Sequence, residues 1–363
     1  MARTYRMDRK EWQGTRIIIL TLLLGCLLAT PAAAEQPAAP LPDIHIIATG
    51  GTIAGTAPDK EDLLRYEPGT LGVAALIASV PELGHYANVT GEQFCNLNSD
   101  DMTPALWLNL SHRVNLLLSS PEVDGIVITH GTDTLEETAY FLNLATMSKK
   151  PVVVTGSMRP ATAISADGPL NLLNAVQLAG SSEAQGMGVL IAMNGEILGA
   201  RDTKKTSTRR TDAFASPDFG RMGYLDDGRP VIYRVSARAH TAESVFNVSG
   251  LTVLPRVDIV TVYPGMDTAA IDAYLQKDTQ GLVIDALGNG EYPEVIHPAL
   301  QAAALKGIPV VIASQAGTGI TTPKDPLFIS ADTLSARKAR ILLMLALTQT
   351  QDRDRIAALF RTY

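Results

Sequence analysis

A short strand followed by two glycines and a threonine is the feature that most constrains the fold of this chain. Residues 43–55 have the sequence DIHIIATGGTIAG, in which the apolar run Ile44–Ile47 predicts a buried β-strand. Gly50 and Gly51 then allow a backbone turn that a Cβ atom would hinder. We therefore expect Thr52 just past the carboxyl end of a strand, where open α/β sheets bind ligands, and its hydroxyl is a candidate nucleophile.

A phosphate-binding loop is the main alternative for a glycine-rich turn after a strand. The segment 50–55 is not followed by the Lys and Ser/Thr of a P-loop, and no G-x-G-x-x-G pattern passes through it. In an arbitrary chain, a threonine at such a place more often just ends a turn. A functional interpretation therefore needs a second motif.

A second apolar run ends in a loop of small residues and leads into a helix. Residues 125–138 have the sequence GIVITHGTDTLEET, and Thr134 and Glu137 have the spacing of a capping box. We expect Thr132 and Asp133 at a strand end beside a helix N-terminus, where free backbone N–H groups favour an anion.

A third copy of the pattern, PVVVTGSMRP at residues 151–160, completes the evidence for an α/β fold. Repeated strand, loop and helix predict a larger N-terminal domain (41–235) with a doubly wound sheet whose loops converge on one site. A linker (236–256) and a smaller C-terminal α/β domain (257–363) follow. The strands expected in the smaller domain are 257–263, 281–287 and 308–313.

Five segments carry a resemblance to a known family. They are ATGGTIAG (48–55), ITHGTDTLEETAYFL (128–142), TGSMRP (155–160), SADGPLNLLNAV (165–176) and ARILLMLALTQT (339–350). In this order they closely resemble the bacterial L-asparaginase and glutaminase-asparaginase family, in its periplasmic, type II branch. The resemblance extends over nearly all of residues 41–363.

The resemblance implies amide hydrolysis through a threonine acyl-enzyme. Thr52 matches the nucleophile, Tyr66 its partner, and Thr132, Asp133 and Lys205 a second catalytic group. An unassisted threonine hydroxyl is a poor nucleophile, so a nearby group must take its proton. A lysine can serve as that base while a carboxylate orients it. Either group could activate the first attack.

Other matched positions are expected to bind the α-amino and α-carboxylate groups of the substrate. Ser99 suits the carboxylate, while Asp100 and Asp133 suit the ammonium, and Thr132 belongs to the same set. Asp100 departs from the family pattern, which has Gln or Glu there. Because Asp is one methylene shorter, water could fill the gap.

Two acidic residues could complete the site of a neighbouring subunit. Glu291 follows the Gly288–Gly290 motif where the family usually has Asn or Ser, and Asp325 is the nearest acid in a segment that is short for the family. A solvated surface carboxylate is the alternative interpretation for both.

The first 34 residues have the pattern of a secretory signal peptide. Basic residues precede the apolar run 17–29, which is short for a membrane span, and Ala32–Ala34 offers an A-x-A cleavage site. We expect a periplasmic protein that starts at Glu35. A lipoprotein acylated at Cys26 is the minor alternative. Cleavage removes five basic and two acidic residues and takes the net charge from −7 to −10, which disfavours nucleic acid as a partner.

Neither a metal nor a cofactor is expected. The six histidines are scattered without metal-ligand spacing, and His130 is interpreted as a structural hydrogen-bonding residue. Cys95, the cysteine left after cleavage, is expected to be a small apolar residue of the interior.

Two functional hypotheses remain. The resemblance implies an enzyme, an L-asparaginase with possible glutaminase side activity, that acts on a small molecule as a homotetramer built from tight dimers. A periplasmic amino-acid-binding protein without catalysis is the alternative, since it also pairs a signal peptide with two α/β domains. Such a protein has no use for Thr52 and Thr132 at neighbouring strand ends.

Overall fold

The computed structural model describes residues 40–363. The predicted signal peptide, with Cys26, lies outside the described residues. In the described part, no helix is both long enough and apolar enough to cross a membrane.

The N-terminal domain is built on an eight-stranded sheet with the order β10-β9-β6-β5-β4-β3-β1-β2. Its strands are β1 (Asp43–Gly50), β2 (Asn88–Leu97), β3 (Gly125–Thr129), β4 (Val152–Thr155), β5 (Val189–Met193), β6 (Glu196–Gly199), β9 (Gly223–Asp226) and β10 (Arg229–Ile232). A separate two-stranded sheet pairs β7 (Lys204–Lys205) with β8 (Phe214–Ala215).

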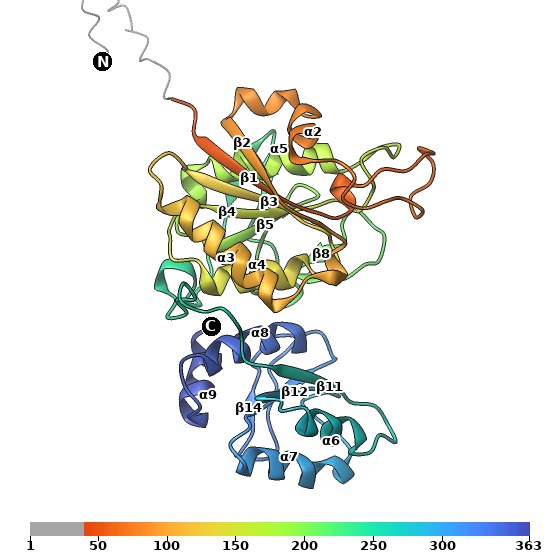
Figure 1. Ribbon diagram of the computed structural model, residues 1–363, viewed down its shortest axis with the longest axis vertical. Coiled ribbons are helices and arrows are strands. Elements are labelled where there is room, and N and C mark those ends of the chain that lie inside the picture. The colour runs from red at the N-terminus through yellow and green to blue at the C-terminus, as the bar shows by residue number, and fades with distance from the viewer. Residues whose placement is uncertain (1–39) are drawn as a thin grey trace, which may run out of the picture. The chain divides into compact units, whose positions relative to one another are not determined.

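Helices of the N-terminal domain cover both faces of this sheet (Figure 1). They are α2 (Val73–Ala78), α3 (Pro104–Ser119), α4 (Leu135–Ala145) and α5 (Gly168–Ala179). The 3₁₀ helices are η1 (Thr52–Ala54), η2 (Pro81–His85), η3 (Ser99–Asp101), η4 (Ser182–Ala184) and η5 (Thr241–Glu243).

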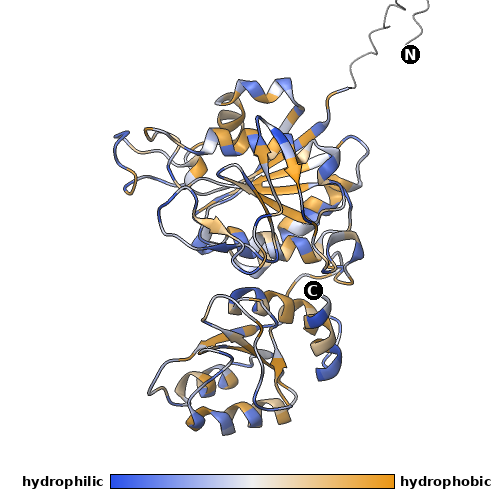
Figure 2. Cartoon of the chain, turned by 180° about the vertical axis from the view of Figure 1, so that it is seen from behind, coloured by the Kyte–Doolittle hydropathy of each residue, from blue (hydrophilic) through white to orange (hydrophobic). Residues whose placement is uncertain are grey.

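Strand β1 shows why the sheet is covered on both sides. Ile44 and Ile46 pack in one apolar cluster with residues of α5, while Ile47, on the opposite face, packs in another with residues of α3 and α4. Because both faces are buried, the strand has an unbroken apolar run rather than an alternating one. Figure 2 shows the central strands as the most hydrophobic part of the domain.

The predicted doubly wound sheet is confirmed for its parallel part. Strands β2, β1, β3, β4 and β5 pair in parallel. β6, β9 and β10 extend the sheet in antiparallel fashion beyond β5. All carboxyl ends of the parallel strands therefore meet at one edge of the sheet, which is where the threonine motifs begin.

The smaller C-terminal domain has its own parallel sheet with the order β11-β12-β13-β14. Its elements are β11 (Val257–Thr261), α6 (Ala269–Gln276), β12 (Gly281–Ala286), η6 (Glu294–Ile296), α7 (His297–Leu305), β13 (Val310–Ser314), β14 (Ile329–Ser330), α8 (Ala336–Leu347) and α9 (Arg353–Thr362). The first three strands overlap the strands expected from the sequence.

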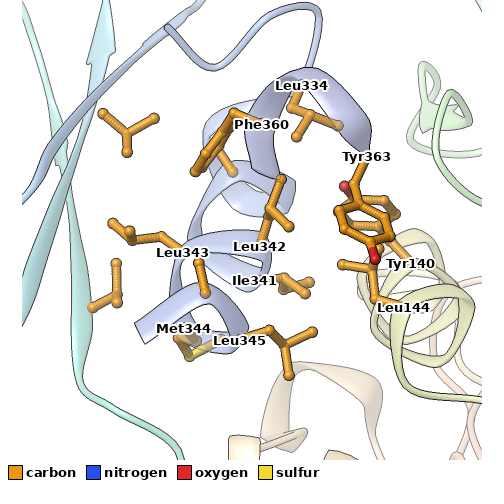
Figure 3. Close-up of a cluster of buried hydrophobic side chains, with 14 of the residues drawn as sticks. Tyr140, Leu144, Leu334, Ile341, Leu342, Leu343, Met344, Leu345, Phe360 and Tyr363 are labelled. Atoms are coloured by element: carbon orange, nitrogen blue, oxygen red, sulfur yellow. The ribbon is translucent and has the colours of Figure 1, made fainter. Parts of the chain in front are cut away.

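Helix α8 joins the two domains through an apolar cluster. Leu342 and Leu345 of α8 and Tyr140 and Leu144 of α4 are fully buried in this cluster, and Figure 3 shows α4 and α8 on either side of it. Phe246 belongs to the same cluster, so the segment that connects the domains is packed rather than free. The C-terminal domain therefore packs directly against α4, the helix that follows Thr132 and Asp133.

Candidate active site

The first threonine motif is shaped by a close approach of two backbone segments. Gly50 and Gly51 both have positive φ, 102° and 77°. A Cβ atom on Gly51 would lie 2.3 Å from the Cα of Gly131, in the loop after β3. Glycine is therefore required at this contact, and it brings Thr52, the first residue of η1, close to the second motif.

Thr52 and Tyr66 form a hydroxyl pair. The Oγ1 of Thr52 lies 2.7 Å from the phenolic oxygen of Tyr66, and either can donate. The loop between them closes on itself through backbone bonds between Thr56 and Glu67. Gly55 makes room for the ring, since a Cβ there would lie 2.7 Å from a ring carbon of Tyr66.

The second group combines a hydroxyl, an ammonium and a carboxylate. Lys205 Nζ donates to Thr132 Oγ1 at 2.9 Å and to Asp133 Oδ1 at 2.6 Å. The Thr132 residue is buried, whereas the Asp133 side chain is 60% exposed. A lysine in this position can take or return the threonine proton, and the exposed carboxylate remains open to a cationic ligand.

Glu136, at the start of α4, holds the backbone of Lys205. Its Oε2 accepts from the Lys205 N–H, while Oε1 lies 3.3 Å from Arg337 Nη2 of helix α8. Glu136 was not among the site residues predicted from the sequence. The acidic pair at the helix start was visible, but only the fold shows that one of its carboxylates points at Lys205.

The predicted capping box of α4 is wrong in its contacts. Thr134 is the N-cap residue, but its side chain makes no cap hydrogen bond and instead donates to the Ser99 carbonyl at 2.6 Å. Glu137 pairs with Arg337 at 3.4 Å, and burial raises the pKa of its carboxyl. The Ser99 carbonyl and the Arg337 guanidinium, both distant in sequence, thus replace the capping-box contacts. They offer Thr134 a hydrogen bond and Glu137 an opposite charge at the same helix end.

Ser99 and Asp100, both predicted to bind substrate, lie in η3 and differ in their surroundings. Ser99 is 3% exposed, and its Oγ accepts from the Asp133 N–H at 3.1 Å. Asp100 is exposed. The structure therefore brings Ser99 into contact with Asp133 of the second group, although neither Ser99 nor Asp100 lines the cavity onto which both threonines open.

A cavity of about 540 Å³ opens onto both threonines. Thr52, Tyr66, Thr132, Asp133 and Lys205 all line it, so the five predicted catalytic residues meet in one place. Its remaining lining residues are Glu61, Asp62, Leu63, Leu64, Met158, Arg159, Thr208 and Arg209. The cavity walls thus carry both signs of charge, as a ligand with both an ammonium and a carboxylate requires.

Glu291 and Asp325 do not line this cavity. Glu291 is paired with Lys324. Asp325 is only 7% exposed and accepts from Gln301 Nε2 at 2.7 Å and from the Leu327 N–H at 2.8 Å. These bonds lower the pKa of the Asp325 carboxyl. The interpretation of Asp325 as a solvated surface carboxylate is wrong.

His130 is a structural residue, as the sequence suggested. It is fully buried between the Gly131 carbonyl, 2.7 Å from Nδ1, and the Thr138 hydroxyl, 3.0 Å from Nε2. Burial lowers its pKa to about 4, so the ring is neutral at pH 7.

Cys95 is partly buried, and desolvation raises the pKa of its thiol to about 11. Within residues 40–363, no group of three or more acidic, histidine or cysteine side chains could hold a metal ion.

Family models cover both domains. Residues 43–238 match the N-terminal asparaginase domain, and residues 256–360 match the glutaminase/asparaginase C-terminal domain. The chain belongs to the asparaginase family. The predicted resemblance is thereby confirmed.

Individual members of the asparaginase family are similar over most of their length. A "Probable L-asparaginase periplasmic" of Haemophilus influenzae is 43% identical over 95% of this chain and 99% of its own. A "Glutaminase-asparaginase" of Pseudomonas fluorescens biotype A is 41% identical over 95% and 97%. A solved structure, a "Probable Cytoplasmic L-asparaginase from Campylobacter jejuni", has a TM-score of 0.87 and 43% identity over 89% of this chain and 100% of its own.

Proposed function

We propose that the chain hydrolyses L-asparagine to L-aspartate and ammonia through a threonine acyl-enzyme, with L-glutamine as a poorer substrate. One observation carries the proposal: two buried threonine hydroxyls, each with its own polar partner, line the same cavity at the ends of neighbouring strands. The names of its relatives, L-asparaginase and glutaminase-asparaginase, agree with it.

In the first step, the Thr52 oxygen attacks the side-chain amide carbon of the substrate. The hydroxyl proton passes to a neighbouring group. Either Tyr66, whose oxygen lies at 2.7 Å, takes it and hands its own phenolic proton on to the leaving nitrogen, or the neutral amine of Lys205 takes it through Thr132 and the bound substrate. Collapse of the tetrahedral adduct breaks the C–N bond, and the leaving nitrogen takes a proton and departs as ammonia. Thr52 then carries the acyl group as an ester.

In the second step, water attacks that ester. Thr132 can take the water proton as it passes its own hydroxyl proton to the neutral amine of Lys205, and Asp133 holds the lysine in place through its 2.6 Å contact. The bond between the acyl carbon and Thr52 breaks, and the proton returns to Thr52. Aspartate leaves, and the enzyme is restored.

Substrate binding is assigned to the residues around the second group. Ser99, beside the free N–H groups at the start of α4, would bind the α-carboxylate. The exposed Asp133 carboxylate would bind the α-ammonium directly, with Asp100 acting through water. Glu291 remains the candidate for the charge that a neighbouring subunit provides, since its side chain is 55% exposed.

The test is ammonia release from asparagine and glutamine, measured side by side on the purified mature protein. Thr52→Ala and Thr132→Ala should each lose on the order of 10³-fold or more in rate with an unchanged circular dichroism spectrum. Substantial turnover by either folded variant would remove that threonine from its role. Binding of asparagine without any ammonia release would instead support a binding protein.

The cellular and quaternary context is proposed with the activity. The Haemophilus relative named as periplasmic supports export through the signal-like segment 1–34, with the mature N-terminus at Glu35. We further propose a homotetramer, a dimer of dimers, with a domain boundary within residues 236–256. Light scattering on the mature protein tests the tetramer, and N-terminal sequencing of the periplasmic fraction tests the cleavage site.

A further inference from the structure

Lys205 lies in a very short strand, β7, whose position is fixed by contacts with the C-terminal domain. β7 consists of Lys204 and Lys205 and pairs with β8. Its two side chains point to different partners, as alternation along a strand requires. Lys205 reaches the catalytic group, while Lys204 donates to the Gly317 carbonyl in the loop after β13.

The segment that leads into β7 is held by a buried ammonium. Lys338, in the first turn of α8, is 0% exposed, and its Nζ donates to the carbonyls of Ala200 (2.8 Å), Arg201 (2.9 Å) and Thr203. An ammonium has three N–H donors, and here all of them are used on one four-residue stretch of backbone. The contact therefore fixes the path of the chain just before Lys205.

Among residues 40–363, no carboxylate lies within ion-pair distance of Lys338. The charged groups that act on it are Glu136, Asp202, Lys204 and Arg201, and its Nζ lies 5.8 Å from the centre of the Tyr140 ring. Burial lowers its pKa to about 8. A buried ammonium without a paired carboxylate is costly, so its three carbonyl bonds have to offset most of that cost.

Helix α8 acts on β7 by a second route as well. Arg337 lies 3.3 Å from Glu136, whose other oxygen accepts from the backbone N–H of Lys205. Neighbouring residues of one helix in the C-terminal domain thus hold the backbone before the predicted catalytic base and, through Glu136, at its own N–H. Neither of them lines the cavity.

We propose that Lys338 is a positioning residue for hydrolysis, which holds the backbone of residues 200–203 so that Lys205 Nζ reaches Thr132 and Asp133. This inference rests on the proposed role of Lys205. It means that the C-terminal domain sets the geometry of the site within its own chain. A displacement of about 1 Å at a reacting group can cost on the order of 10²-fold in rate.

The experiment compares Lys338→Met with Lys150→Met. Lys150 is a matched control, because its Nζ also donates to backbone carbonyls, those of Ser120 (2.6 Å) and Val123 (2.7 Å). It lies just before β4, at the edge of the sheet opposite the site. Thermal unfolding, kcat and KM for asparagine are measured for both, and Lys338→Gln replaces Lys338→Met if the latter does not fold.

We expect both variants to melt at a lower temperature, but only Lys338→Met to lose at least about tenfold in kcat, with KM within about threefold of the parent. In a Lys205→Met background, Lys338→Met should add less than about twofold, since both act through one group. If Lys338→Met keeps its kcat as Lys150→Met does, or if the two losses multiply, the inference is overturned. If Lys205→Met itself stays active, the assigned role of Lys205 fails, whereas absence of ammonia release by the parent would contradict the proposed function.

Discussion

Thr52 and Thr132 obtain their partners over very different distances in the sequence. Tyr66 follows Thr52 by 14 residues, in a loop that closes on itself and carries the exposed Leu63 and Leu64. Lys205 follows Thr132 by 73 residues and is held by Glu136 and by groups of helix α8. The first pair is local to one loop, while the second group joins two distant segments and is held by a third, helix α8.

This difference has a mechanistic consequence. A local loop can open and close without disturbing the sheet, so the Thr52–Tyr66 pair can be formed when substrate enters. The second group is connected to helix α8 of the C-terminal domain through Lys338 and Arg337. We therefore expect substitutions in the loop to affect one group alone, and substitutions in the second group to be felt in both activity and stability.

The largest expected effect is on catalysis by the second group. Lys205→Met removes the ammonium from Thr132 and Asp133 and should lower kcat by on the order of 10³-fold. Its neighbour Lys204, whose side chain points to Gly317, provides the control. Lys204→Met should lose less than about tenfold. Equal losses would mean that the positive charge of β7, rather than the contact to Thr132, matters.

The buried His130, in the loop after β3, should give the protein a pH-dependent stability. The pKa of His130 is lowered from 6.5 to about 4, so on acidification the unfolded chain binds the proton first. Stability from this residue is fully present above pH 6.5 and is lost as the pH falls towards 4, by about 3 kcal/mol in all.

Denaturant unfolding of the parent and of His130→Gln at several pH values between 4 and 7 checks this expectation. The variant should show a shallower fall in the free energy of unfolding over that range. His85→Gln, at an exposed histidine, is the control and should keep the parent slope. Parallel slopes for the parent and His130→Gln would assign the acid sensitivity to other groups.

A substitution in the local pair should leave the second group in place. In Gly55→Ala the new Cβ would lie 2.7 Å from the Tyr66 ring, which has to shift away from Thr52. We expect kcat to fall by about thirtyfold, because the Tyr66 hydroxyl moves away from Thr52, and the melting temperature to fall as well, because Gly55 is buried. Gly250→Ala, where no atom lies within 4 Å of the new Cβ, is the control. A full-rate Gly55→Ala enzyme would show that Tyr66 is not needed in this position.

The smallest effect is expected at Asp100. This residue is exposed and does not line the cavity, but it follows Ser99, which contacts the N–H of Asp133, so its charge should reach the substrate ammonium only through water. Asp100→Asn should raise KM for both asparagine and glutamine by roughly threefold and leave kcat nearly constant. Asp101→Asn, next to it in η3 and also exposed, should change neither constant. An unchanged KM in Asp100→Asn would remove this carboxylate from substrate binding.

The sequence by itself determined the local parts of this protein. Apolar runs before small-residue loops placed β1, β3 and β4 correctly, because burial on both faces of a parallel sheet requires such runs. The Gly-Gly pair marked the turn at Thr52. Motif order then identified the family and named the five residues that the structure brings to one cavity.

Only the tertiary structure decided which polar groups became partners. Thr134 donates to the Ser99 carbonyl instead of capping its helix, and Asp325 is buried against Gln301. Lys338 donates to the Thr203 carbonyl, 135 residues away in the sequence. A side chain pairs with whatever donor or acceptor the packed fold brings within about 3 Å, and a buried group left without a partner is costly. Sequence spacing carries that information only within a turn or two of a helix, so the contacts that fix Lys205 had to come from the fold.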